Sequence, residues 1–318
     1  MKKVFLATVL AGMLVGITAC GSQEASTVPK TTEAVIDSTV ESAGGQTAGE
    51  TATTETQATA EQTAQTEQSG QNGAEATDAV QFVMEDHEGN SDPEDKTRSY
   101  TYSYQTVTVT IPGNETAQTK IQKDLDEYVD SFVEGLSTGD FGTIYEGESS
   151  GTPSYEDLTF QVIRADDKVI SVAWGIEGYD QGAHGWYNLV YENYYTQTGE
   201  KITFDSLGSG FRDKALELVT AKAAEMQAEQ DCFFPDYESS IKLVVLDGTE
   251  DLNAIYQEIY GADIAGMDNG TATPTFGITE DGFFFESGQY VLQPYAAGII
   301  DIEIPAEDFG DALTADIF

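Results

Sequence analysis

Histidine and cysteine, the residues that most often bind metals or act in catalysis, are scarce in this 318-residue chain, which has two of each. His87 is expected at the acidic edge of a linker, which leaves His184 as the one histidine of the folded part. A zinc site built from several imidazoles is therefore excluded. The sequence also lacks a Walker loop and a His-Glu-x-x-His motif. We expect no catalytic residue, no metal and no cofactor.

His184 lies in the segment Tyr179 to Tyr195, between glycines at positions 182 and 185 and beside Trp186. The glycines let the backbone turn, so His184 and Trp186 are expected to display a flat surface at the end of a sheet. A histidine hydrogen-bonded within a tight loop is the first interpretation. A histidine that contacts a ligand is the second, and a catalytic histidine ranks well behind both.

Carboxylates are so abundant that no pair stands out as the acid and base of a glycosidase, although such a pair is not excluded by counting. The oxygen-rich segment Glu85 to Asp95 lacks the glycine position and the terminal glutamate of an EF-hand loop. We interpret any calcium binding there as weak and adventitious.

The first residues have the pattern of a targeting signal. Lys2 and Lys3 precede a mostly apolar stretch from Val4 to Ala19, which is shorter than the roughly 20 residues that a membrane-spanning helix needs. The stretch ends in Ile17-Thr18-Ala19-Cys20-Gly21, which resembles a bacterial lipoprotein signal; an ordinary secretory signal is the alternative. The resemblance implies that Cys20 is diacylated and anchors an extracytoplasmic protein to the lipid bilayer.

The next segment, residues 20–78, is rich in Thr, Ala, Glu, Gln and Ser, and no aromatic residue occurs between the leader and Phe82. Such a composition predicts a disordered tether. Residues 79–318 form the folded part, with 11 basic and 46 acidic residues and a formal net charge of −35. This charge excludes nucleic acid as a partner. It is explained most simply by solubility, and alternatively by a basic partner.

Apolar periodicity in the folded part predicts α+β architecture: an antiparallel sheet, formed by a meander and C-terminal hairpin strands, with two or three helices packed on it. The folded part is one domain or, alternatively, two sub-units at about residues 97–165 and 166–309. No β-α-β alternation is expected. The expected strands are 99–111, 158–162, 169–176, 189–195, 201–204, 275–278, 283–286 and 297–304, and the expected helices are 121–136, 211–230 and one capped by Thr249.

Two blocks of the sequence resemble one family. The first is Gly182-Ala183-His184 with the tyrosine-rich strand and the turn Thr198 to Thr203; the second is Phe276, Phe283 to Phe285 and Pro294-Tyr295-Ala296-Ala297-Gly298. Together they are similar to the extracytoplasmic domain of RsiV-like anti-sigma factors, shared with the N-terminal domain of PdaC-like peptidoglycan deacetylases. The similarity covers roughly Thr97 to Phe309.

The resemblance implies a ligand-binding domain without catalysis of its own. In the RsiV-like branch the ligand is lysozyme, a basic protein, which fits the acidic charge of this domain. The ligand-binding candidates are His184, Trp186, Tyr290 and Tyr295. Since the sequence shows neither a sigma-binding segment nor a deacetylase domain, we expect a stand-alone lipoprotein.

The leading hypothesis is therefore a surface lipoprotein that binds lysozyme or a cell-wall component such as peptidoglycan. An envelope enzyme that acts on peptidoglycan through a carboxylate pair is the alternative, and a structural wall module is a third hypothesis.

Overall fold

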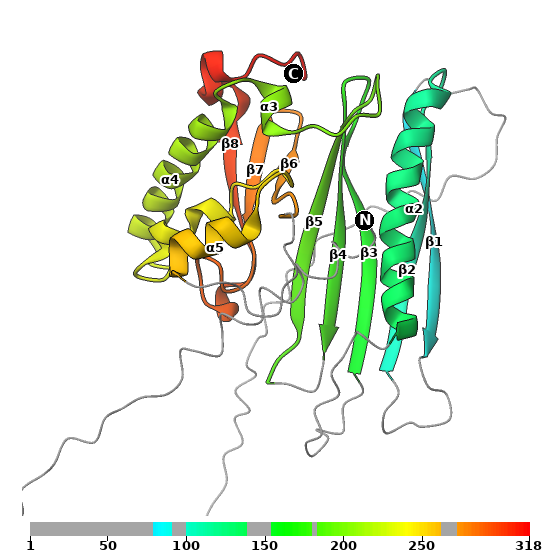
Figure 1. Ribbon diagram of the computed structural model, residues 1–318, viewed down its shortest axis with the longest axis horizontal. Coiled ribbons are helices and arrows are strands. Elements are labelled where there is room, and N and C mark those ends of the chain that lie inside the picture. Colours follow the sequence, from blue (N-terminus) through cyan, green and yellow to red (C-terminus); the bar gives the residue numbers. More distant parts are fainter. Residues whose placement is uncertain (1–78, 91–99, 139–153, 180–182, 262–271) are drawn as a thin grey trace, which may run out of the picture. The chain divides into compact units, whose positions relative to one another are not determined.

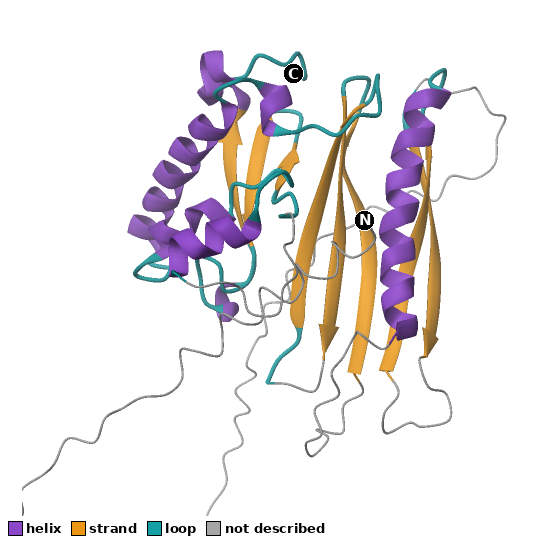
Figure 2. Ribbon diagram, viewed as in Figure 1, coloured by secondary structure: helices purple, strands orange, loops and turns teal. Residues whose placement is uncertain are grey.

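The computed structural model describes residues 79–90, 100–138, 154–179, 183–261 and 272–318. These residues form two sheets with helices packed on them (Figures 1 and 2). The expected leader, Cys20 and the tether lie outside the described residues. Among the described residues, no helix combines the length and the apolar character needed to cross a membrane.

The larger sheet has five strands in sequential order. They are β1 (Gln81–Asn90), β2 (Tyr100–Thr110), β3 (Ser154–Ala165), β4 (Val169–Tyr179) and β5 (Trp186–Tyr195). Neighbouring strands are antiparallel except β2 and β3, which are parallel and are connected by helix α2 (Glu115–Thr138). The α+β class with mostly antiparallel sheets is confirmed. The expectation of no β-α-β unit is wrong for this pair, because α2 provides the long crossover that parallel strands require.

Helix α2 also completes the hydrogen bonding of β2. The pairing of β2 with β3 ends at Tyr104, and beyond it the Gln105 side chain accepts a hydrogen bond from the N–H of Phe160 (2.7 Å). From there, two glutamines of α2 replace the missing strand. Gln118 accepts from the N–H of Ile111 (3.0 Å), and Gln122 accepts from the N–H of Val109 (2.9 Å). The parallel pair of β2 and β3 is therefore hydrogen-bonded over only part of its length, and side chains of α2 bond to the β2 backbone beyond Tyr104.

The apolar side of α2 covers one face of this sheet. Asn114 caps the helix by accepting from the N–H of Ala117 (3.2 Å). The core beneath the helix centres on Trp174, which is fully buried, stacks on Tyr128 (5.1 Å between ring centroids) and meets Phe160 edge-on. The buried residues of the helix recur at helical spacing: Ile121, Leu125, Tyr128, Val129, Phe132 and Leu136.

The second sheet has three antiparallel strands, β6 (Phe276–Ile278), β7 (Gly282–Ser287) and β8 (Ile300–Pro305). Its apolar face packs on helix α4 (Phe211–Gln230), where Phe211 stacks on Phe309 and meets Phe283 edge-on. The remaining elements are α3 (Phe204–Leu207), α5 (Leu252–Tyr260) and the 3-10 turns η2 (Tyr237–Leu243), η3 (Tyr295–Ala297) and η4 (Ala306–Ala312).

Polar side chains of the larger sheet join the two sheets. Asn193 donates to the carbonyl of Phe276 (2.9 Å), and the Ser171 hydroxyl accepts from the N–H of Ile278 (3.0 Å). Arg164, whose side chain is 6% exposed, donates to Asp166 and to the carbonyls of Thr279 and Ile317. The two sheets therefore belong to one compact unit.

The alternative division into two sub-units, 97–165 and 166–309, would place the boundary in the tight turn between β3 and β4.

Three local expectations are corrected by the structure. His87 lies within β1, where its ring stacks on Tyr104 (4.7 Å), rather than at the edge of a tether. The strand expected at 201–204 is wrong: Lys201 forms only an isolated bridge with Tyr194, and a capping box of Thr203 with Ser206 begins helix α3. The cap of α5 is Asp251 rather than Thr249, because the Thr249 hydroxyl donates to Asp247 instead.

Candidate ligand-binding surface

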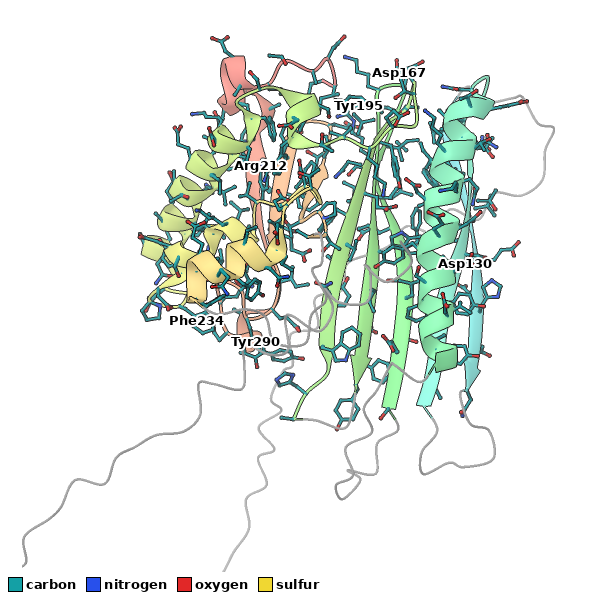
Figure 3. All side chains as sticks on the ribbon, in the orientation of Figure 1. Asp130, Asp167, Tyr195, Arg212, Phe234 and Tyr290 are labelled. Atoms are coloured by element: carbon teal, nitrogen blue, oxygen red, sulfur yellow. The ribbon has the colours of Figure 1, made fainter. Side chains whose placement is uncertain are left out.

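Three of the four candidate binding residues converge in space. His184 lies in the turn before β5, Tyr290 in the β7–β8 loop and Tyr295 at the start of η3. The ring of His184 stacks on that of Tyr295 (3.7 Å between centroids), and its Nε2 lies 3.0 Å from the Tyr290 hydroxyl. We call these residues the His–Tyr cluster. Figure 3 labels Tyr290, which lies at the end of the molecule where β5 begins.

The β7–β8 loop that carries both tyrosines is held by Gln293. This side chain is fully buried and accepts a hydrogen bond from the Ser287 hydroxyl (2.7 Å). Its amide nitrogen donates to the carbonyls of Ser287, Gly288 and Gly298. Because the Gln293 amide bonds to the backbone on both sides of the loop, these hydrogen bonds fix the backbone conformation of the loop that carries the two tyrosines.

Tyr290 itself has an unusual backbone conformation. Its φ of 65° places a bulky residue in the left-handed region, which glycine and asparagine normally occupy. Such residues persist only where the surrounding structure holds them, and they are concentrated at functional sites. The conformation aims the Tyr290 ring at His184, so the strained position and the cluster are one feature.

Carboxylates act on two further tyrosines, Tyr155 of β3 and Tyr187 of β5. Burial, followed by the charges of Glu177 and Asp157 and by Tyr295, raises the pKa of Tyr155. Burial, followed by the charges of Glu286, Glu177 and Asp301, raises the pKa of Tyr187. The tyrosine hydroxyls next to the cluster are therefore neutral hydrogen-bonding groups in an acidic environment.

Among the described residues, Glu177 is exposed and has no ion-pair partner. All nine lysines and arginines of the described residues form ion pairs, and every one of these pairs involves an acidic residue elsewhere in the fold. Within the described ranges, no group of three or more histidine, cysteine or acidic side chains is arranged to hold a metal ion. Within the described part of the chain, Glu177 is thus an exposed carboxylate that no lysine or arginine pairs with.

Glu286 is the most perturbed carboxyl in this region. It is 4% exposed, and the Tyr191 hydroxyl of β5 donates a hydrogen bond to it. Its pKa is raised to about 8, mainly by burial. The hydrogen bond from Tyr191 lowers the pKa, and the charge of Asp301 raises it further. Glu286 is therefore predominantly protonated at neutral pH and joins the two sheets as a neutral group.

Trp186, the fourth candidate, packs against the core under α2. It begins β5, is half-buried and covers Gly178, where an added Cβ would lie 2.6 Å from the indole. Sequence reasoning did not single out Tyr155, Glu177, Tyr187, Gln293 or Glu286, whose positions depend on strand register. Cys20 lies outside the described residues, as does part of the Glu85–Asp95 segment.

The different surroundings of His184 and Trp186 predict different effects on stability. Replacing Trp186 by alanine is expected to lower the free energy of unfolding by about 2 kcal/mol, because a half-buried indole loses its packing. Replacing the exposed His184 by alanine should change it by less than about 0.5 kcal/mol. Chemical denaturation of the two variants measures this difference, and equal losses would contradict the placement of Trp186 in the core.

Comparisons with known proteins find similarity at the level of solved structures. No family model matches the chain, and neither does any curated protein. A DUF3298-family protein from Bacteroides fragilis is 14% identical, with a TM-score of 0.46, over 74% of this chain and 94% of the other. A DUF3298-family protein from Pseudomonas aeruginosa PAO1 is 12% identical, with a TM-score of 0.45, over 75% and 96%.

Proposed function

We propose that this protein is an extracytoplasmic lipoprotein, anchored through acylated Cys20, whose folded part binds a ligand without chemical turnover. The His–Tyr cluster is the proposed contact surface. The proposed ligand is a basic protein such as lysozyme, or a component of the cell wall. The resemblance to RsiV-like and PdaC-like domains supports this proposal, because His184 and Tyr295 belong to the blocks that show it.

The observation that supports the proposal most is the convergence of the three rings at one end of the sheet, where Glu177 is exposed and has no ion-pair partner among the described residues. Exposed aromatic rings provide large contact area at low conformational cost, and they stack equally well on cationic side chains and on flat ligand surfaces. The acidic residues beside them favour association with a positively charged partner and disfavour a negatively charged one.

The test compares the full-length protein with a variant in which His184 and Tyr295 are both alanine. Binding to lysozyme and to insoluble peptidoglycan is measured by co-sedimentation and calorimetry. We expect the double variant to bind at least roughly tenfold more weakly, as when a contact of about 1.4 kcal/mol is lost. Tyr260→Ala, which removes a 44% exposed tyrosine of α5, is the matched control and should bind as the unaltered protein does.

Salt separates the two classes of ligand. Binding to a basic protein should weaken steeply between low and physiological ionic strength, since exposed charges are screened over about 8 Å at physiological salt. Binding that resists salt would favour a wall component. If the double variant retained full affinity for both ligands, the proposed surface would be wrong.

Glu286 and Asp301 are the carboxylate pair that the alternative enzymatic hypothesis would use. They are partners across β7 and β8, and the pKa of both is raised, primarily by burial. Glu286 is nevertheless buried against Tyr191, so we assign it a structural role.

The sequence also contains a Gly-x-Ser-x-Gly match at 147–151, which lies outside the described residues. The match falls between helix α2 and strand β3, whereas the nucleophile elbow of a hydrolase follows a strand and precedes a helix.

A further inference from the structure

Strand β5 is the edge of the five-stranded sheet, and its odd-numbered residues direct their backbone groups away from β4. Three N–H groups show this direction: that of Tyr195 donates to the carbonyl of Glu200, that of Tyr191 to the carbonyl of Pro274, and that of Tyr187 to the side chain of Gln289. The carbonyl of Asn193 also faces outward and accepts from the N–H of Ile202. The register with β4 is unbroken along the strand, so Leu189 faces the same way.

The outward groups of Leu189 are open. Among the described residues, neither its N–H nor its C=O has a hydrogen-bond partner, and the residue is partly exposed. On either side the edge is closed, at Tyr187 by the Gln289 side chain (3.3 Å) and at Tyr191 by Pro274 (3.5 Å). A donor and an acceptor side by side on one residue form the unit that pairs with the backbone of an added strand.

The surroundings of Leu189 indicate the kind of strand that fits. Gln289, which closes the edge at Tyr187, is the residue before Tyr290 of the His–Tyr cluster. Glu177 of β4 is exposed, faces Tyr187 across the sheet and has no ion-pair partner among the described residues. A lysine or arginine on an added strand would meet this carboxylate and the ring faces of the cluster.

We infer that Leu189 is the backbone docking point for an extended, cationic peptide segment of a protein partner. One residue of the segment pairs its C=O and N–H with those of Leu189, in the gap between Gln289 and Pro274, and a basic side chain of the segment contacts Glu177. This inference rests on the proposed function, since it specifies what binds beside the His–Tyr cluster. The charge of the site favours a peptide over a neutral glycan, although an acetamido group could make the same pair of hydrogen bonds.

The experiment uses the full-length protein in detergent micelles and the peptide acetyl-Lys-Val-Lys-Val-Lys-amide as the probe. Leu189→Pro removes the outward N–H without removing a ladder hydrogen bond, because proline is tolerated where the N–H of an edge strand faces solvent. Leu189→Ala retains the N–H and is the matched control. We expect Leu189→Ala to bind the peptide as the unaltered protein does and Leu189→Pro to lose at least roughly tenfold in affinity.

Two further readouts do not depend on the folding of the proline variant. The same peptide with N-methylated backbone amides keeps its charge but cannot donate to Leu189, and it should bind at least roughly tenfold more weakly. The amide of Leu189 should exchange with deuterium faster than that of Val190 in the free protein, and it should become protected when the peptide binds.

The outcomes separate this inference from the proposed function. Backbone pairing would be overturned if Leu189→Pro and Leu189→Ala bound the peptide with equal affinity. It would also be overturned if the N-methylated peptide bound the unaltered protein as tightly as the unmethylated peptide does. Failure of the unaltered protein to bind the peptide at about 1 mM would overturn it as well. A preference for an N-acetylated oligosaccharide that depends on the Leu189 N–H would replace the peptide with a glycan. In each case the proposed function still stands if replacing His184 and Tyr295 weakens binding to lysozyme or peptidoglycan, and it fails if that replacement has no effect.

Discussion

Replacing Arg164 by alanine is expected to lower the free energy of unfolding by about 3–5 kcal/mol, the usual cost of breaking a buried ionic network by removing one partner. The guanidinium contacts Asp166 (2.6 Å), the carbonyl of Thr279 (2.9 Å) and the carbonyl of Ile317 (2.6 Å), and lies over the ring of Phe318. Burial alone would raise the pKa of Asp166, but the N–H of Val169 and Arg164 together hold it below its usual value. Losing Arg164 therefore leaves two carbonyls without this donor and leaves Asp166 with only the backbone donors of Lys168 and Val169.

Chemical denaturation of Arg164→Ala measures this loss. Lys123→Ala is the control, because Lys123 and Glu127 form an ion pair in which both side chains are about two-thirds exposed. That variant should stay within about 0.5 kcal/mol of the unaltered protein. A loss of less than about 1 kcal/mol for Arg164→Ala would show that the sheets are held together by apolar packing alone.

Glu286 is expected to make the stability of the protein fall as pH rises. Its pKa in the fold is about 8 against 4.5 for the ordinary carboxyl, so between these values the folded state holds a proton that the unfolded state has released. The neutral form stabilises the fold fully below about pH 4.5, and this contribution is lost as pH approaches 8. Integrated over that window, the loss is on the order of 4 kcal/mol.

Denaturation of the unaltered protein and of Glu286→Gln across pH 5 to 8.5 isolates this effect. The glutamine side chain is uncharged throughout, so the stability of the unaltered protein should decrease relative to that of the variant as pH rises. Glu229→Gln is the control, because Glu229 is an exposed residue of α4 that is not among the groups acting on the pKa of Glu286 or Asp301. The fall in stability with pH should persist in that variant. Parallel profiles for Glu286→Gln and the unaltered protein would show that Glu286 is ionised in the fold.

Local periodicity was sufficient to predict the long helices. The apolar positions of α4 repeat at helical spacing, and its observed bounds, Phe211 and Gln230, are those expected. Strand β1 was missed as a regular element because its sequence, QFVMEDHEGN, is acidic and only its first residues are apolar. The parallel pairing of β2 with β3 was also missed, since it depends on where a distant strand docks after a helix, which local pattern does not reveal.

The candidate surface was predicted in part. Of the four candidates chosen from the sequence, the rings of His184, Tyr290 and Tyr295 lie together in the structure, whereas Trp186 packs against the core under α2. Glu177 could not be distinguished by sequence from the other carboxylates of so acidic a chain. The open backbone of Leu189 has no sequence signal at all, because it arises from which way an edge residue faces.

The direction of the strands determines how the domain would bear tension. Gln81 pairs with Thr110, and Asn114, just beyond that end of β2, bonds to the carbonyls of Thr196 and Gln197, so the chain enters β1 at the end of the sheet where β5 finishes. The His–Tyr cluster lies at the opposite end, as Tyr290 and Tyr195 show in Figure 3. A pull between the preceding segment and a bound ligand would thus run along the strands. The hydrogen bonds between the strands lie perpendicular to that direction, so the pull would load them in shear and all at once. They would not break one after another.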